Sequence, residues 1–195
     1  MKNNSTITKK IIAGKYKGKT LKLPSKETTR SSKGIVLESF FNTLQFDVID
    51  SVLVEVFSGS GSIGLEALSR GAKKIIFMEK DRDAIRTLRE NIAQTDPASC
   101  EILEGDSFSN MVQVKKRLTA LGESAFFYVD PPFAYREGME EIYDKTIAMI
   151  ASLPLELAKL IILEHMSTLE LPELIGHFNR IKSKRFGKTS LTYYA

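Results

Sequence analysis

From residue 52 onward, short apolar runs alternate with segments in which apolar residues recur every three or four positions. Short apolar runs predict buried strands, and the three-to-four spacing predicts amphipathic helices. The predicted strands cover residues 52–57, 74–79, 101–103, 125–129 and 159–164, and the predicted helices cover residues 65–70, 83–94, 108–121 and 138–151. Strands that alternate with helices indicate right-handed crossovers, and therefore a parallel sheet.

The two ends of the chain follow other patterns. Lysines alternate with apolar residues and glycines from Ile11 to Leu23, which predicts a small β-hairpin or an extended arm. A helix is predicted over about residues 33–46. Residues 178–186 and 189–194 predict two strands joined by a tight turn. The expected fold is thus α/β, with a mostly parallel sheet of seven strands, an antiparallel C-terminal hairpin and a small basic N-terminal β arm.

Charge divides the chain more sharply than composition does. Residues 1–34 contain ten Lys and Arg against one Glu, and residues 180–195 contain five and no acid. The two ends together carry +14, and the remainder carries −10, within a net charge of +4. We expect residues 1–34 to form a basic arm, as an extension of the domain formed by residues 35–195. Basic ends suit a polyanionic partner, although a solubilising tail is the alternative for the arm.

Composition excludes several other classes of protein. A length of 195 residues suits one domain with a full core. No apolar run approaches membrane-spanning length, and the N-terminus has no apolar signal region. Cys100 is the only cysteine, which fits a reducing compartment, and with His165 and His177 it makes no standard metal site. We therefore expect a cytoplasmic protein, a monomer, that uses neither a metal nor a membrane.

A glycine loop follows the first predicted strand of the body. Residues 59–64 read G-S-G-S-I-G, and such glycines let a strand-to-helix turn approach a nucleotide cofactor closely. Glu79 ends the second strand, where a carboxylate can bind two ribose hydroxyls, and Asp106 follows the third. These features alone fit NAD and S-adenosyl-L-methionine equally. For each acid taken separately, a solvated strand end is the simpler explanation, but Glu79, Asp106 and Asp130 at successive strand ends indicate a site.

The stretch Asp130-Pro131-Pro132-Phe133 favours methyl transfer. Two prolines cannot continue a strand, so a stiff turn holds a carboxylate, a carbonyl and an aromatic ring at the strand's carboxyl end. Hydride transfer has no use for this arrangement. An exocyclic amine of a nucleobase needs it, because its lone pair is delocalised and must be aimed at the methyl donor. The Asp130 carboxylate and the Pro131 carbonyl can accept hydrogen bonds from the two N–H groups of the amine, and Phe133 can stack on the base.

With these motifs the chain resembles the RsmD family of 16S rRNA guanine-N2 methyltransferases, within the Rossmann-like class I S-adenosylmethionine-dependent methyltransferases. The similar segments are KIIAGKYKGK at 10–19, LESFFN at 37–42, FSGSGSIGLEALSRGA at 57–72, DPPF at 130–133 and the RFG…LTYY hairpin at 185–194. The resemblance covers nearly the whole chain. It departs at residues 30–38, where R-S-S-K-G-I-V-L-E replaces the usual R-P-T-x-D-x-V-R-E and retains Arg30 and Glu38.

The resemblance implies S-adenosyl-L-methionine as cofactor and 16S rRNA of the small ribosomal subunit as partner. The implied cofactor-binding residues are Phe57, Ser58, Gly59, Ser60, Gly61, Gly64, Glu79, Asp106 and Ser107. The implied catalytic residues are Asp130, Pro131, Pro132 and Phe133, and the RNA-binding residues are Lys15, Lys17, Lys19, Arg30 and Lys33.

Three alternatives remain beside this interpretation. An N6-adenine methyltransferase acting on DNA or RNA would use the same turn, although the chain has no separate target-recognition domain. A non-enzymatic RNA-binding or assembly factor could keep the scaffold, but it would need neither the glycine loop nor Asp130. A nicotinamide dehydrogenase is disfavoured because no proton donor is evident near the fourth strand.

Overall fold

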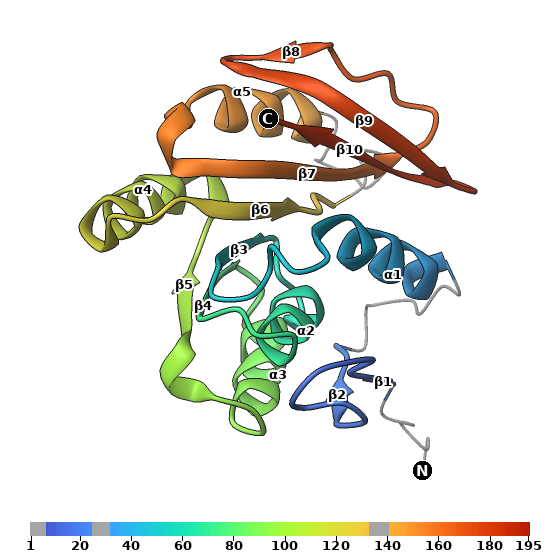
Figure 1. Cartoon of the computed structure of the whole chain (residues 1–195), viewed down its shortest axis with the longest axis vertical. Helices are drawn as coiled ribbons and strands as arrows, with labels where there is room; N and C mark the ends of the chain where they lie inside the picture. Colours follow the sequence, from blue (N-terminus) through green and yellow to red (C-terminus); the bar gives the residue numbers. More distant parts are fainter. Residues whose placement is uncertain (1–6, 25–31, 133–140) are drawn as a thin grey trace.

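The computed structural model, which describes residues 7–24, 32–132 and 141–195, is built on one eight-stranded sheet (Figure 1). Its spatial order is β5-β4-β3-β6-β7-β10-β9-β8. The first five strands in this order pair in parallel, and the last three are antiparallel. The strands are β3 (Val52–Val56), β4 (Lys74–Glu79), β5 (Cys100–Glu104), β6 (Ala125–Val129), β7 (Ala158–Met166), β8 (Leu174–Ile175), β9 (Phe178–Phe186) and β10 (Thr189–Tyr194).

Helices cover both faces of the parallel part of the sheet (Figure 1). Helices α1 (Ser32–Leu44), α2 (Ser62–Ser69) and α3 (Arg82–Ile92) share one core cluster, and α4 (Ser107–Leu121) and α5 (Ile142–Ala151) share the other. Two short 3₁₀ helices, η1 (Pro97–Ser99) and η2 (Leu155–Leu157), precede β5 and β7. Strands β3 and β6 are buried along their whole length, as expected for parallel strands covered on both faces.

The order of the strands reverses at β3. The chain passes from β3 to β4 and β5 on one side, and then returns to place β6 on the other side. In open α/β sheets, ligands bind where the carboxyl ends of two such diverging strands meet. Val56 pairs with both Met78 and Val129, so the residues that follow β3, β4 and β6 emerge at one edge. We call this the carboxyl edge.

The N-terminal arm is a separate antiparallel pair of strands, β1 (Thr8–Lys10) and β2 (Thr20–Lys22). The hairpin was expected over residues 11–23, and this was wrong in its boundaries, because residues 11–19 form the connection between the strands. Ile11 and Leu21 are buried in the core cluster of α1–α3. The buried carboxylate of Glu66 accepts hydrogen bonds from the backbone N–H groups of Ile12 at 2.8 Å and Ala13 at 3.1 Å. The arm is therefore tied to α2.

The predicted fold class is confirmed, with one more strand than expected. The extra strand, β8, pairs with β9 alone within the described chain, and its two residues are too few to show a strand pattern in the sequence. The C-terminal hairpin of β9 and β10 has the predicted boundaries. Helix α5 begins at Ile142 in the described chain, and residues 138–140 of the predicted helix lie outside it. Within the described ranges, no helix is both long and apolar enough to cross a membrane.

Candidate active site

The glycine loop turns sharply between β3 and α2. Gly59 and Gly61 have φ angles of 51° and 76°, in the left-handed region that glycine adopts readily, and Phe57 lies there too at 62°. A Cβ atom at Gly61 would lie 2.3 Å from Leu88 Cδ1, and one at Gly64 would lie 2.5 Å from Phe77 Cε1. Glycine is thus required at both positions, because the loop packs directly on side chains of α3 and β4.

A buried carboxylate behind the loop fixes the start of α2. Glu55, the fourth of the five residues of β3, accepts hydrogen bonds from the N–H groups of Ile63 at 3.2 Å and Gly64 at 2.7 Å. The N-cap residue Gly61 has no side chain to cap the helix, so Glu55 supplies the acceptor and its negative charge faces the positive end of the helix. Sequence reasoning missed Glu55, although a single acid inside an otherwise apolar strand was a visible signal.

Glu79 lies beside the glycine loop, as its spacing predicted. Its Oε2 accepts a hydrogen bond from Gly59 N–H at 2.7 Å, and its Oε1 accepts from Lys80 N–H and Asp81 N–H at 2.8 Å each. A carboxylate has about four acceptor sites, so these contacts leave one on Oε2. Glu79 therefore holds the loop in place and keeps room for a further donor such as a ribose hydroxyl.

Asp106 and Ser107 begin α4 beyond β5. The Asp106 carboxylate caps this helix by accepting from Ser109 N–H at 3.0 Å, and Ser107 is buried. The next residue, Phe108, was not predicted from the sequence. Its ring meets that of Phe57 edge to face, with 5.6 Å between the centroids. This pair of rings joins the ends of β3 and β5 and offers an apolar surface of the kind that an adenine ring packs on.

The residues after β6 reach the carboxyl edge next to the glycine loop. Asp130 is half-buried, its N–H points to the Val56 carbonyl at 3.4 Å, and Pro131 is buried. Phe133, expected to stack on the target base, lies outside the described residues. Two residues before Asp130, on β6, the Tyr128 hydroxyl donates a 2.5 Å hydrogen bond to Glu164 Oε2 of β7. Burial and the nearby carboxylates of Glu164 and Asp130 raise the pKa of Tyr128, so its hydroxyl stays protonated and acts as a donor.

Sequence reasoning missed the contact between Tyr128 and Glu164. Both side chains are buried, and they lie on neighbouring strands, where Tyr128 pairs with Ile162, two residues before Glu164. Glu164 ends the predicted strand 159–164, so a carboxylate at the end of an apolar run was again the available signal.

The lysines of the arm lie on the connection between β1 and β2. Lys15, Lys17 and Lys19 are exposed, and the Lys15 and Lys19 ammonium groups lie 5.2 Å and 5.6 Å from the centroid of the Tyr16 ring. Lys19 also donates to the Gln94 carbonyl. Arg30 lies outside the described residues, and for Lys33 the structure describes the helical backbone alone.

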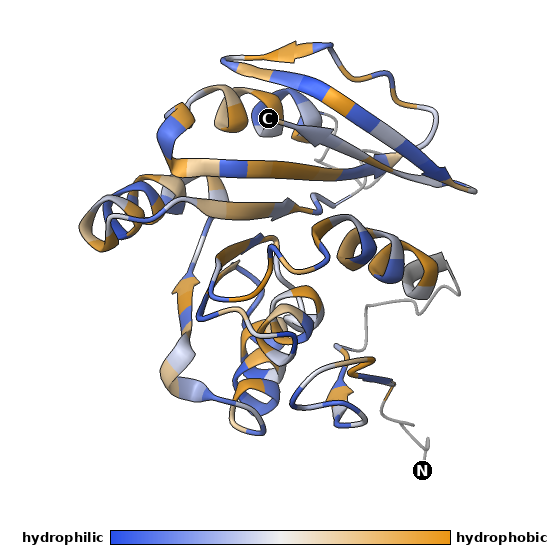
Figure 2. Cartoon of the chain, in the orientation of Figure 1, coloured by the Kyte–Doolittle hydropathy of each residue, from blue (hydrophilic) through white to orange (hydrophobic). Residues whose placement is uncertain are grey.

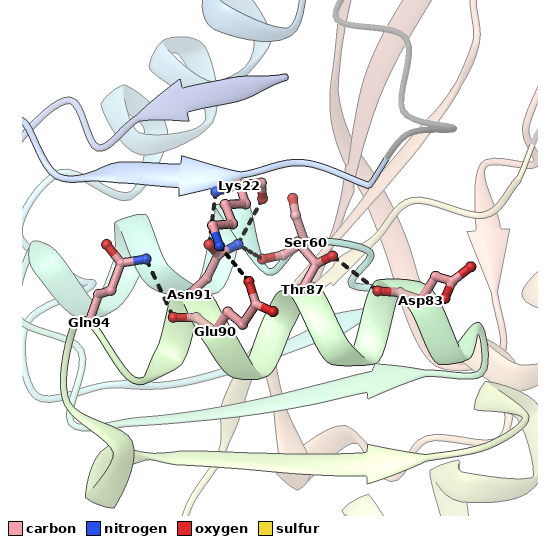
Figure 3. Close-up of polar contacts among 7 residues, drawn as sticks. All are labelled: Lys22, Ser60, Asp83, Thr87, Glu90, Asn91 and Gln94. Atoms are coloured by element: carbon pink, nitrogen blue, oxygen red, sulfur yellow. Dashed lines mark hydrogen bonds and ion pairs between the residues drawn. The ribbon is translucent and has the colours of Figure 1, made fainter. Parts of the chain in front are cut away.

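Besides its contact with α2, the arm is joined to the glycine loop through Asn91 of α3 (Figure 3). Asn91 is fully buried, and its amide nitrogen donates to the carbonyls of Lys22 at 2.9 Å and Ser60 at 3.0 Å. Its amide oxygen accepts from Lys22 N–H at 2.8 Å. The amphipathic pattern of this helix gave no signal for Asn91, because its two partners are distant in sequence.

The fold and this edge together define a class I methyltransferase: a glycine loop after the central strand, an acid after the next, and an Asp-Pro-Pro turn across the switch point. More specifically, the chain belongs to the family described as "Conserved hypothetical protein 95", whose pattern matches residues 9–195. The expected RsmD relationship and class I fold are confirmed.

Individual relatives agree with this assignment. The chain is 28% identical over 95% of its length, and 97% of the relative's, to a Bacillus subtilis protein named "Putative rRNA methyltransferase YlbH". It is 31% identical to ribosomal RNA small subunit methyltransferase D of Escherichia coli, over 68% of this chain and 63% of that protein. Among solved structures, an E. coli protein titled "Putative methyltransferase yhhF" has a TM-score of 0.77 and 26% identity, covering 96% of this chain and 97% of that one. A methyltransferase solved with SAH, at 13% identity and a TM-score of 0.60, covers 86% of this chain and 50% of that one and shows the fold alone.

Proposed function

We propose that this protein transfers the methyl group of S-adenosyl-L-methionine to the exocyclic N2 amine of a guanine in 16S rRNA of the small ribosomal subunit. The observation that carries the proposal is the position of Asp130 and Pro131. They leave β6 at the switch point, where the strand on one side, β3, ends in the glycine loop. An amine held by the turn would thus face a methyl donor held by the loop.

The protein's residues position the reactants in this proposal. The Asp130 carboxylate and the Pro131 carbonyl accept hydrogen bonds from the two N–H groups of the amine, and Phe133 stacks on the base. The nitrogen lone pair would then form a bond to the methyl carbon as the carbon–sulfur bond breaks. The two electrons of the broken carbon–sulfur bond would stay on sulfur. The amine loses one proton, for which the Asp130 carboxylate is the adjacent acceptor. The rate gain comes from orientation and from a fixed negative charge near the developing positive nitrogen.

The cofactor is assigned to the glycine-loop side of the carboxyl edge, facing the base held by Asp130. Residues 57–61 and Gly64 would hold the methionine part and the ribose close to the backbone, and Glu79 Oε2 would accept a ribose hydroxyl. Asp106 and Ser107, with the rings of Phe57 and Phe108, would flank the adenine. This assignment is supported by the hydrogen bond from Gly59 to Glu79, which already brings the loop and the acid together.

The RNA is assigned first to the arm. Lys15, Lys17 and Lys19 are exposed on one connection, and Arg30 and Lys33 follow in the sequence before the body begins. Cationic side chains on this face would neutralise backbone phosphates, so RNA affinity would fall steeply with salt. A stacked and paired guanine in a duplex cannot enter the site beside the cofactor, so the target base must be unpaired or flipped out.

A tritium-transfer assay tests the proposal directly. Wild-type protein and labelled S-adenosylmethionine are incubated with 16S rRNA and with small ribosomal subunits, and the digested product is identified by nucleoside mass spectrometry. The expected product is N2-methylguanosine. N6-methyladenosine would replace the proposal with the adenine alternative. Cofactor binding without transfer to either RNA substrate would favour a non-enzymatic RNA-binding role.

A further inference from the structure

Two lysines of β9 lie over α1, and neither has an acidic partner among the described residues. The Lys182 ammonium lies 3.4 Å from Thr43 Oγ1, and the Lys184 ammonium lies 3.2 Å from Ser39 Oγ. Ser39 and Thr43 are one helical turn apart, and the two lysines alternate along β9, so the four groups form one continuous patch. We call these four residues the α1–β9 patch. Figure 1 shows α1 beside the β9–β10 hairpin, and Figure 2 shows hydrophilic residues along much of β9.

The two ammonium groups repel each other. Partial burial and the positive charge of Lys184 lower the pKa of Lys182. In the part of the chain that the structure describes, neither lysine forms a salt bridge, whereas the neighbouring Arg180 is paired with Glu173. Glu38 is the adjacent acid on α1, and its side chain is exposed and unpaired with either lysine. The Thr43 hydroxyl donates its proton to the Ser39 backbone carbonyl at 2.9 Å, so the two ammonium groups and the Ser39 hydroxyl are the donor groups of the patch, and their positive charge is one that an anion would neutralise.

The register of the sheet places this patch at the carboxyl edge. Glu164 pairs with Leu191, and Leu191 pairs with Lys184. Val129 pairs with Leu163, so the following residue, Asp130, continues this row on β6. Three strand spacings of about 4.8 Å put the backbone of Lys184 roughly 14 Å from that of Asp130. That separation is too long for the target base itself and suits a phosphate of a flanking nucleotide.

We propose that Lys182, Lys184 and the Ser39 hydroxyl bind a backbone phosphate of the RNA substrate, a short distance from the nucleotide held by Asp130, with Thr43 accepting from Lys182. This inference rests on the proposed function for the identity of the polyanion. It adds to the arm a second RNA contact, built from elements about 140 residues apart in the sequence. With the arm and this patch, the RNA would be held at two separate places on the protein.

The test compares three double variants with the wild type. Lys182→Gln/Lys184→Gln removes the two charges, and Lys182→Arg/Lys184→Arg keeps them. Lys115→Gln/Lys116→Gln removes two charges from α4, on the opposite face of the sheet, and is the matched control. The measurements are RNA affinity for a 16S rRNA transcript at several salt concentrations, KM for RNA, kcat, and S-adenosylmethionine affinity.

We expect the Lys182→Gln/Lys184→Gln variant to bind RNA several-fold more weakly, with a salt slope smaller by about 0.7 if one phosphate on a single strand is lost. Its KM for RNA should rise while kcat and cofactor affinity stay close to those of the wild type. The arginine variant and the α4 control should retain the wild-type slope. An unchanged slope in the glutamine variant overturns the proposal, as does an equal loss in the α4 control.

The assay separates this inference from the proposed function. If wild-type protein transfers no methyl group to RNA, the proposed function fails, whereas the binding slopes still report on the α1–β9 patch. If the wild type methylates RNA and the glutamine variant matches it in slope and KM, only the patch proposal fails.

Discussion

The side-chain amide of Asn91 lies 3.0 Å from the carbonyl oxygen of Ser60, and it donates a hydrogen bond to it from α3 (Figure 3). The same amide exchanges two hydrogen bonds with the backbone of Lys22. One buried side chain therefore links the arm proposed to bind RNA to the loop proposed to hold the cofactor. The two binding functions are joined by a short, direct path of hydrogen bonds.

We predict that Asn91→Asp destabilises the protein and weakens cofactor binding. Aspartate has nearly the same shape, but it cannot donate to the carbonyls of Lys22 and Ser60, and both would face a buried negative charge. Two lost hydrogen bonds should cost about 1–3 kcal/mol of unfolding free energy. Chemical denaturation and calorimetry with S-adenosylmethionine measure both effects. Gln94→Glu, an exposed amide-to-acid change at the end of the same helix, is the control, and equal behaviour of the two variants would contradict the role given to Asn91.

Replacing Glu79 with Ala should weaken S-adenosylmethionine binding. The change removes three backbone contacts that hold the loop, together with the acceptor offered to the ribose. A loss of about 1–3 kcal/mol corresponds to roughly a 5- to 150-fold rise in Kd by calorimetry. Glu104→Ala removes the acid paired with Glu79 across the strands, at the end of β5, and serves as control. Wild-type affinity in Glu79→Ala would show that the cofactor is held elsewhere.

Asp130→Ala should abolish methyl transfer and leave cofactor affinity nearly unchanged. The side chain is the one acceptor for the amine that a mutation can remove, since the other is the Pro131 carbonyl. Asp130→Asn should also lose most activity, because it replaces a charge with a competing donor. Retention of more than about a tenth of wild-type turnover, or under roughly 1.4 kcal/mol of barrier, would mean that the turn is structural. Single-turnover assays with saturating cofactor provide the comparison.

We expect Tyr128→Phe to destabilise the fold more than Tyr194→Phe does. Both hydroxyls belong to buried tyrosines, but Tyr128 donates to the Glu164 carboxylate and Tyr194 donates to the Pro172 carbonyl at 2.8 Å. Hydrogen bonds to charged groups contribute about 1.5–3 kcal/mol, against about 0.5–1.5 for neutral ones. Urea denaturation of the two variants gives the two free energies. Similar values would show that Glu164 does not depend on Tyr128 for its stabilisation.

Stability should decrease in acid through His165. Burial lowers the pKa of this side chain, while its hydrogen bond to the Met166 carbonyl opposes the shift. The unfolded chain therefore binds a proton near pH 6.5 that the folded chain resists, so this contribution to stability is present above pH 6.5 and is lost as the pH falls below it. The wild type should lose more unfolding free energy between pH 8 and pH 5 than His165→Gln does. Parallel pH dependences for the two proteins would contradict this assignment.

Much of the fold followed from local sequence patterns. Apolar runs and helical spacing are local properties, so they located the strands and helices of the body to within a few residues. The glycine loop, Glu79 and Asp130 could also be found, because an α/β sheet brings the carboxyl ends of successive parallel strands to one edge. The stretch Asp130-Pro131-Pro132-Phe133 then favoured methyl transfer over hydride transfer.

Only the tertiary structure decided how these residues are supported. Asn91 joins Lys22 and Ser60, Tyr128 bonds Glu164, and Lys182 and Lys184 lie on hydroxyls of α1. Each contact joins residues that are tens of positions apart in the sequence, so no local period or spacing contains it. It arises from strand order and register, which are set by how the whole chain packs. The sequence by itself therefore determined the chemical groups at the edge, and the packing of the chain determined what holds them there.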